Sequence, residues 1–155
     1  MTAATLVVIP MRNEAATIEA VVAGVRRHAV DVLVVDDGST DAGAERARAA
    51  GADVLSLSPN RGKGFALRQG LRVAAERGYA RVATLDADLE HDPADLAALL
   101  AALDDGADVV LGERRLGWAI GCGRWLFQGQ AADELASYDE RHAHPVGAWL
   151  WAQSS

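Results

Sequence analysis

Residues 32–41 have the sequence Val32-Leu33-Val34-Val35-Asp36-Asp37-Gly38-Ser39-Thr40-Asp41, and this segment decides the class of fold. Its first four residues are apolar and mostly β-branched, which is typical of a strand buried on both faces of a sheet. The strand ends abruptly in acidic residues, and Gly38 permits a sharp turn after them. A buried strand that leads through a turn into a helix indicates a parallel sheet layered by helices.

The same alternation of strand and helix recurs on both sides of this segment. Further short apolar strands are predicted at 6–9, 54–57, 82–85 and 108–111. We therefore predict an α/β fold with a mostly parallel, Rossmann-like open sheet and helices on both of its faces. Sheets of this kind bind ligands beyond the carboxyl ends of their strands, where the acidic segments of this chain fall.

Helices are predicted between the strands from apolar spacing and from terminal signals. Residues 14–28 carry Ile18, Val21, Val22 and Val25 on one helical face, with Asn13 as the expected N-cap. A short Ala/Arg helix is expected to end at Gly51, and a longer one covers 65–77 and stops at Gly78. A fourth helix is expected to start at Asp92-Pro93 and to end at Gly106. Its apolar stripe is Leu96, Leu99, Leu100 and Leu103.

The pattern covers residues 5–115, which we predict to be one domain, and it does not continue into residues 116–155. All four tryptophans lie in this second segment, where no clear strand or helix period is present. We expect the segment to be irregular, with a short helix at Asp133–Arg141. The abrupt change in composition suggests a truncation, a frameshifted end or a diverged end.

The overall composition limits the classes of function. The net charge of -7 argues against a nucleic-acid binder, because phosphate backbones favour clustered Lys and Arg. Cys122 is the only cysteine, so no disulfide within the chain is expected, which suits a reducing compartment. No apolar run reaches the roughly 18 residues of a membrane span. We expect a cytoplasmic protein whose membrane contact, if any, is peripheral.

Asp86-Ala87-Asp88 at the end of the fourth strand is the strongest candidate for chemistry. Residues two apart on an extended chain point the same way, so Asp86 and Asp88 can face one site. Two neighbouring carboxylates repel each other unless a cation compensates them, and a divalent ion that prefers oxygen ligands is the natural partner. Glu90 adds a third possible ligand. The alternative is a solvated acidic turn before a helix.

Three further segments follow strands and carry polar side chains. Asp37 can accept hydrogen bonds from a base or a ribose, whereas Asp41 is expected to favour a helix N-terminus. The loop 60–64 contains Lys63 between glycines, which suits phosphate contact, although the spacing of a P-loop is absent and a flexible surface loop is the alternative. Arg114 after the fifth strand could neutralise a diphosphate, or it could belong to a solvated turn.

In their order and spacing these segments resemble family two glycosyltransferases with the A-type fold. The closest resemblance is to the branch of dolichol-phosphate mannose synthases and polyprenyl-phosphate glycosyltransferases. It runs from about Leu6 to Arg115, and it is carried by Val8-Ile9-Pro10-Met11-Arg12-Asn13-Glu14, by residues 34–41, by Asn60-Arg61-Gly62-Lys63-Gly64 and by Asp86-Ala87-Asp88-Leu89-Glu90-His91-Asp92-Pro93.

The resemblance implies roles for individual residues. It implies that Asp88 holds Mg²⁺ or Mn²⁺ with Glu90 as second ligand, a place where members of this branch often have Gln. Asp88 and Arg114 would act on the leaving diphosphate. The residues implied to bind the nucleotide sugar are Pro10, Arg12, Glu14, Val35, Asp37, Lys63, Asp86, Ala87, Asp88 and Arg114.

The implied reaction is transfer of a sugar from a UDP- or GDP-sugar to an acceptor, which the resemblance suggests is a polyprenyl phosphate at a membrane surface. Family members continue with an acceptor-binding region that we do not locate after Arg115. A nucleotide-sugar-binding domain without turnover is therefore the first alternative. A receiver-type signalling domain is a second, although it would need a Lys after the fifth strand. Assembly as a homo-oligomer is left open.

Overall fold

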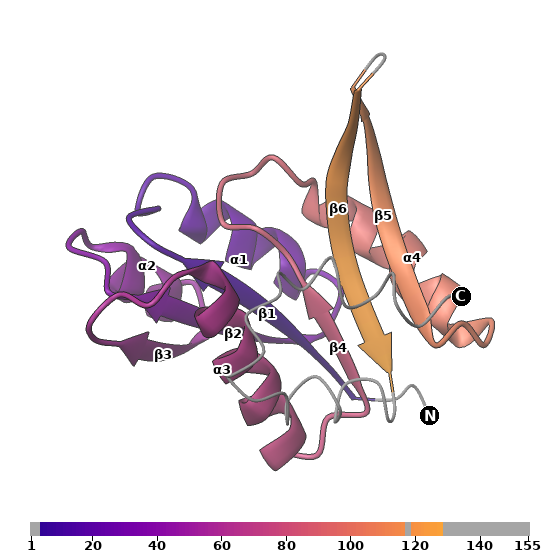
Figure 1. The fold of residues 1–155 in the computed structure, drawn as a ribbon, viewed down its shortest axis with the longest axis horizontal. Helices are drawn as coiled ribbons and strands as arrows, with labels where there is room; N and C mark the ends of the chain where they lie inside the picture. The colour runs from indigo at the N-terminus through magenta and orange to yellow at the C-terminus, as the bar shows by residue number, and fades with distance from the viewer. Residues whose placement is uncertain (1–3, 117–118, 129–155) are drawn as a thin grey trace.

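The computed structural model describes the backbone of residues 4–116 and 119–128 and the side chains of residues 4–110. Strands and helices alternate along the chain, and two antiparallel strands follow the last helix (Figure 1). The elements are β1 (Thr5–Met11), α1 (Ile18–Arg26), β2 (Asp31–Asp37), α2 (Gly43–Ala49), β3 (Asp53–Leu57), α3 (Lys63–Glu76), β4 (Arg81–Thr84), η1 (Pro93–Asp95), α4 (Leu96–Asp104), β5 (Val109–Leu116) and β6 (Ala119–Gln128).

The strands form one six-stranded sheet in the order β3-β2-β1-β4-β6-β5. The pairs β1–β2, β1–β4 and β2–β3 are parallel, so the carboxyl ends of these four strands lie along one edge. β6 is antiparallel to both β4 and β5. The prediction of a mostly parallel sheet with helices on both faces is therefore confirmed for β1 to β4 and their helices.

The predicted pattern is wrong at the β5 edge of the sheet. We expected β5 to be the last strand and residues from 116 onward to be irregular, but residues 119–128 form β6 and separate β5 from β4. β6 forms because it pairs with strands on both of its edges, and such long-range pairing overrides a weak local pattern. The expected helix at Asp133–Arg141 lies outside the described residues.

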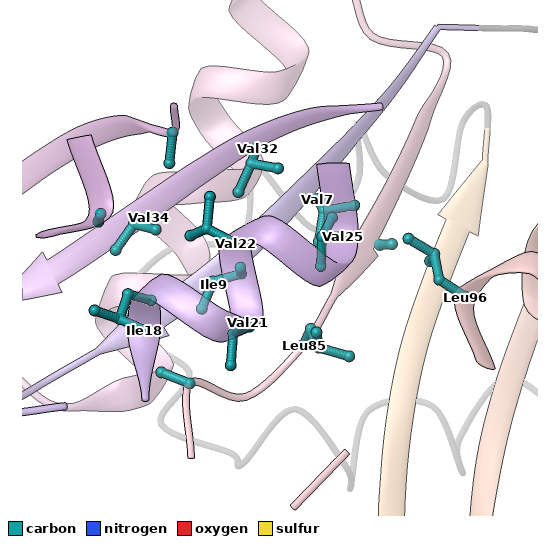
Figure 2. Packing of buried hydrophobic residues seen from close by; sticks show 14 of the residues in the cluster. Val7, Ile9, Ile18, Val21, Val22, Val25, Val32, Val34, Leu85 and Leu96 are labelled. Atoms are coloured by element: carbon teal, nitrogen blue, oxygen red, sulfur yellow. The ribbon is translucent and has the colours of Figure 1, made fainter. Parts of the chain in front are cut away.

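Alternate residues of the central strands supply two cores, one on each face of the sheet. Val7 and Ile9 face the helices α1, α2 and α4, and they pack with Val22, Val34 and Leu96 (Figure 2). On the other face, Leu6, Val8, Leu33 and Val35 pack against α3. Every residue of β1 is buried, as expected for a strand covered on both faces.

Helix termini agree only in part with the sequence. Asp92 does cap η1, since its carboxylate accepts the N–H of Ala94 at 2.9 Å. Asn13 does not cap α1, which begins at Ile18, because the Asn13 side chain instead accepts the N–H of Thr40. The glycines expected to end three helices follow α2, α3 and α4 with positive φ, namely Gly51, Gly78 and Gly106.

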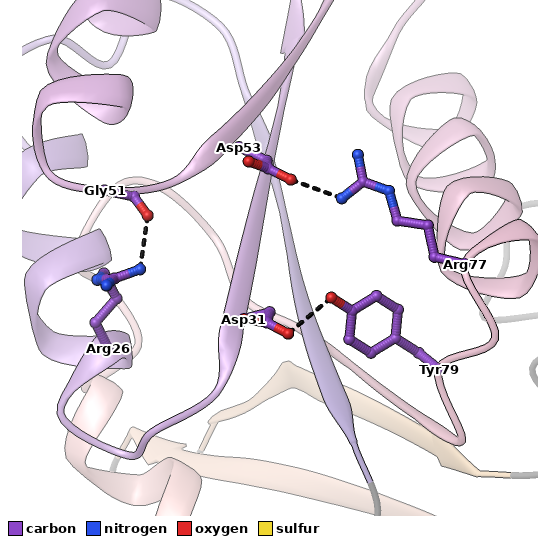
Figure 3. Close-up of polar contacts among 6 residues, drawn as sticks. All are labelled: Arg26, Asp31, Gly51, Asp53, Arg77 and Tyr79. Atoms are coloured by element: carbon purple, nitrogen blue, oxygen red, sulfur yellow. Dashed lines mark hydrogen bonds and ion pairs between the residues drawn. The ribbon is translucent and has the colours of Figure 1, made fainter.

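A polar network ties α3 to the amino ends of the strands, at the edge opposite the acidic segments (Figure 3). Tyr79 donates a hydrogen bond of 2.7 Å to Asp31, and Arg77 donates one of 2.6 Å to Asp53. The bond to Asp31 raises the pKa of Tyr79, and the bond to Asp53 raises the pKa of Arg77. On the other face, Arg26 holds the carbonyl of Gly51 at 2.7 Å.

Candidate functional site

A cavity of about 330 Å³ opens at the carboxyl ends of the parallel strands, where this class of fold binds ligands. Four connections meet there: those after β1, β2, β3 and β4. The cavity therefore joins segments that are far apart in the sequence. Its wall is formed by Pro10, Met11, Arg12, Glu14, Asp37, Asn60, Gly62, Lys63, Ala66, Asp86, Ala87 and Asp88.

Most of the residues singled out from the sequence lie in this wall, but Val35 and Glu90 do not. Val35 is fully buried in the core under α3, so its predicted nucleotide contact gains no support from the cavity. Glu90 is exposed beside the cavity and outside its wall. Arg114 lies in β5, where its backbone is opposite Gly121, and its side chain is outside the described residues.

Asp37 holds the loop that forms one side of the cavity. Its two carboxylate oxygens accept the N–H groups of Arg61 at 2.8 Å and of Gly62 at 2.7 Å. Gly62 has a φ of 93°, a conformation that side chains disfavour. Asp37 is 3% exposed, so its charge is stabilised by these backbone donors rather than by water. It combines a place in the wall with a structural role.

Lys63, the only lysine of the chain, begins α3 and crosses to the loop after β4. Its ammonium lies 2.6 Å from Asp86 Oδ1. The other carboxylate oxygen of Asp86 is 3.9 Å from Nδ1 of His91. His91 is buried, and this nitrogen has no hydrogen-bond partner within the described part of the chain. His91 therefore lies against the acidic segment.

Asp88 offers oxygen ligands at the cavity wall next to this ion pair. Its Oδ1 accepts the backbone N–H of Glu90 at 2.9 Å. Among the described residues, no group of three or more potential metal ligands converges. A divalent cation at Asp88 would therefore need oxygens from a bound substrate. Mg²⁺ fits such a donor set, because it is commonly bound through one or two carboxylates together with substrate phosphates.

The connections after β1 and β2 are joined by reciprocal hydrogen bonds. The Asn13 side chain accepts the N–H of Thr40 at 2.8 Å, and the N–H of Asn13 donates to the hydroxyl of Ser39 at 2.9 Å. Asp41 accepts the N–H of Gly43 at the start of α2 and that of Ala15 in the other loop. The structural role predicted for Asp41 is confirmed. These bonds fix the position of the neighbouring wall residues.

Four wall residues received no role of their own from the sequence. Asn60 and Gly62 belong to a loop that was singled out as a whole, and the Asn60 side chain accepts the Gly62 N–H at 3.1 Å. Met11 and Ala66 are apolar and carry no signal that separates them from core residues. They reach the cavity because they lie at the end of β1 and in the first turn of α3.

Comparison with known proteins identifies a family and several relatives. The model of glycosyl transferase family 2 matches residues 6–117. A polyprenol monophosphomannose synthase of Mycolicibacterium smegmatis is 40% identical over 119 residues, which are 71% of this chain and 44% of that protein. An undecaprenyl-phosphate mannosyltransferase of Micrococcus luteus is 39% identical over 119 residues, 72% of this chain and 48% of that protein. The chain thus spans less than half the length of these two relatives.

Solved structures show the same fold. A glucosyl-3-phosphoglycerate synthase of Mycobacterium tuberculosis in complex with phosphoglyceric acid has a TM-score of 0.68 and 27% identity, covering 81% of this chain and 57% of that one. A complex with Mn²⁺, UDP-glucose and phosphoglyceric acid has a TM-score of 0.60 and 33% identity, covering 70% of this chain and 42% of that one. Within the described part of this chain, no helix is both long and apolar enough to cross a bilayer.

Proposed function

This chain belongs to glycosyl transferase family 2, and from that premise we propose that its cavity binds a nucleoside diphosphate sugar for metal-dependent transfer of the sugar. Family membership confirms the resemblance seen in the sequence and removes the receiver-type alternative. The observation that carries the proposal is the convergence of Lys63, Asp86 and Asp88 at the cavity wall.

The wall divides into two ends with different chemistry. By resemblance to the family, we assign Pro10, Arg12, Glu14 and Asp37 to the nucleoside. The connections after β1 and β2 that carry them are fixed to each other by side-chain hydrogen bonds. The diphosphate end consists of Asp86, Ala87 and Asp88 together with Lys63.

At the diphosphate end, Lys63 supplies a cation and Asp88 supplies oxygen ligands for Mg²⁺ or Mn²⁺, with Glu90 beside it. When bound, such a metal acts as a Lewis acid on the leaving diphosphate. Related structures contain Mn²⁺ with UDP-glucose, or Mg²⁺ with UDP. Arg114 in β5 is assigned a second contact with the donor phosphates, by resemblance.

For the acceptor we propose a polyprenyl phosphate, because two relatives carry polyprenol or undecaprenyl phosphate in their names. A phosphate acceptor is already ionised at neutral pH, so it needs no strong general base for attack on the sugar. A peripheral position on the cytoplasmic face of a membrane and assembly with a second copy stay predictions. The nucleotide, UDP or GDP, is left to experiment.

A turnover assay tests this function. The full chain would be incubated with Mn²⁺, undecaprenyl phosphate and radiolabelled UDP-glucose, UDP-galactose or GDP-mannose, and label in the lipid extract would be measured. We expect one donor to label the lipid and Asp88→Asn to abolish the labelling. The exposed Asp108→Asn is the charge-matched control. If no donor either binds or transfers, the proposal is wrong.

The second candidate function is a donor-binding domain without turnover. The observation in its favour is that every role assigned above to the described residues belongs to the donor side of the reaction. Saturable binding of a nucleotide sugar without transfer to undecaprenyl phosphate would select this function over the first.

A further inference from the structure

A contact between α1 and the loop after β4 is not used by any role assigned above. Thr17 immediately precedes α1, and its hydroxyl lies 2.6 Å from the carbonyl oxygen of Ala87. The same hydroxyl is 3.4 Å from Oε2 and from the carbonyl oxygen of Glu14. A hydroxyl has one proton to donate, so the short contact receives it. Thr17 therefore holds Ala87, which lies 70 residues further along the chain.

The peptide group that Thr17 holds connects Ala87 with Asp88. Because a peptide unit is planar, fixing the Ala87 carbonyl also fixes the direction in which the chain enters Asp88. Ala87 itself is 4% exposed and belongs to the core cluster that contains Ile18. The Thr17 bond is thus anchored at both ends in the packed layer formed by α1 and the sheet.

The residues just after this peptide adopt a conformation that needs support. Leu89 has a φ of 62°, in the left-handed region, and it is 44% exposed, so burial of its side chain contributes little. A bulky residue held in this region costs roughly 1–3 kcal/mol, and it persists only where its surroundings impose it. The bond from the Glu90 N–H to Asp88 acts within the turn, whereas Thr17 acts on it from outside.

We propose that Thr17 is a positioning residue that directs Asp88 toward the metal and diphosphate end of the donor site. The inference rests on the proposed function of the cavity. Lys63 holds the same segment from the α3 side through Asp86. Asp86 and Asp88 are thus oriented from opposite layers of the fold. Loss of the Thr17 bond leaves the backbone at Asp88 without its support from α1.

A purely structural role for Thr17 makes a different prediction. Loss of a hydrogen bond that only stabilises the fold lowers the free energy of unfolding and weakens nucleotide binding equally with and without metal. Loss of a bond that positions Asp88 weakens the metal-dependent part of binding alone. The ratio of the dissociation constants measured with Mn²⁺ and with EDTA separates the two roles.

The experiment uses the full chain and calorimetric titration with UDP and with GDP, each in Mn²⁺ and in EDTA. We expect Thr17→Val to raise the dissociation constant in Mn²⁺ about five- to tenfold, the value of one hydrogen bond. In EDTA the change stays below about twofold, since the wall outside Asp88 is intact. Thr17→Ser keeps the hydroxyl and restores binding in Mn²⁺.

Three further variants make the test specific. Ser56→Ala is the control, because it removes an exposed hydroxyl that accepts a hydrogen bond from Arg48 outside the cavity wall, and it leaves both dissociation constants unchanged. In an Asp88→Asn background, Thr17→Val has no further effect on binding in Mn²⁺ if Thr17 acts through Asp88. In Thr17→Val a methyl group lies against the Ala87 carbonyl. If that variant does not fold, Thr17→Ala gives the same readout.

The outcomes also separate this inference from the proposed function. If the unmodified chain binds neither nucleotide, or binds equally with Mn²⁺ and EDTA, the proposed donor site is wrong. If the unmodified chain shows Mn²⁺-dependent binding and Thr17→Val either leaves it unchanged or weakens both conditions equally, only the role of Thr17 is overturned.

Discussion

Asp37 and Gly62 are joined by a hydrogen bond of 2.7 Å, in which the buried carboxylate accepts a backbone N–H from a loop 25 residues away. The other oxygen of Asp37 accepts the N–H of Arg61. The acidic residue at the end of β2 therefore shapes the side of the cavity that carries Lys63. The side chain that we propose to contact the nucleoside therefore also sets the geometry of this loop.

Asp37→Asn should destabilise the fold by about 1–3 kcal/mol, because the amide NH₂ of this buried side chain then faces one of the two loop N–H donors that the carboxylate accepted. Urea unfolding followed by circular dichroism measures this change. Asp108→Asn, which alters an exposed acidic residue, serves as the control and should shift stability by less than about 0.5 kcal/mol. Equal stability of the Asp37→Asn variant and the unmodified chain would contradict the role of Asp37 in the loop.

Lys63→Met should affect ligand binding far more than stability. The Lys63 side chain is 61% exposed and that of Asp86 30%, so their ion pair contributes at most about 1 kcal/mol to folding. A cation that contacts a diphosphate contributes more free energy to ligand binding than this ion pair contributes to folding. Loss of the Lys63 ammonium should therefore weaken UDP or GDP binding about tenfold or more. Arg27→Gln, an exposed cation on the surface after α1, is the control.

The same residue offers a direct spectroscopic readout. Since Lys63 is the only lysine, reductive ¹³C-methylation labels one side chain besides the N-terminus. We expect its NMR signal to shift on addition of nucleotide, as the ammonium exchanges Asp86 for a phosphate. A Lys63 signal that stays unchanged at saturating nucleotide would exclude contact between them.

Gly70→Ala should destabilise the packing of α3 on the sheet. An added Cβ would lie 2.3 Å from Cγ1 of Val8 and 3.3 Å from Cγ2 of Val35, both on central strands that have little room to move. Overpacking of this kind costs about 1–3 kcal/mol. Gly64→Ala is the matched control in the same helix, since no atom lies within 4 Å of its added Cβ. Urea midpoints that are equal for the two variants would refute the close contact.

Alkaline pH should weaken the Tyr79–Asp31 contact. Hydrogen bonding to the Asp31 carboxylate raises the pKa of Tyr79, so the folded state favours the protonated phenol. The stability from this bond is fully present below the ordinary tyrosine pKa of about 10, and it is lost as the pH rises through the higher pKa of the folded chain. An ultraviolet titration in a Tyr138→Phe background reports Tyr79 alone. Asp31→Asn should lower its midpoint, and an unchanged midpoint would contradict the contact.

Local patterns were sufficient to predict the parallel part of the fold. The runs around Val7, Val34 and Ala83 are apolar and short, and the spacing of Ile18, Val21 and Val25 gives α1 its buried face. These features depend on residues close in sequence. The order of the strands in the sheet depends on residues far apart in sequence, so the position of β6 between β4 and β5 was not predicted. Its pairing partners are brought together only by the folded sheet.

The candidate site was predictable in composition and less so in geometry. Asp37, Lys63, Asp86 and Asp88 were found because polar residues after parallel strands converge on one edge. The partners of these residues could not be predicted from the sequence. Asp37 accepts a hydrogen bond from a loop 24 residues away, and Asp86 pairs with Lys63 at the start of α3. Asn13 was misassigned as a helix cap because an asparagine before a helix satisfies a neighbouring loop equally well.

The central claim is that Asp88 makes donor binding dependent on a divalent metal, and the melting temperature tests it most directly. The full chain and its Asp88→Asn variant would be heated with UDP- and GDP-sugars in Mn²⁺ or in EDTA. For the unmodified chain, a donor at about 100 times its dissociation constant should raise the midpoint by roughly 5–10 °C in Mn²⁺. EDTA or Asp88→Asn should remove that increase. An equal increase in the Asp88→Asn variant, or no increase with any nucleotide sugar, would contradict the account.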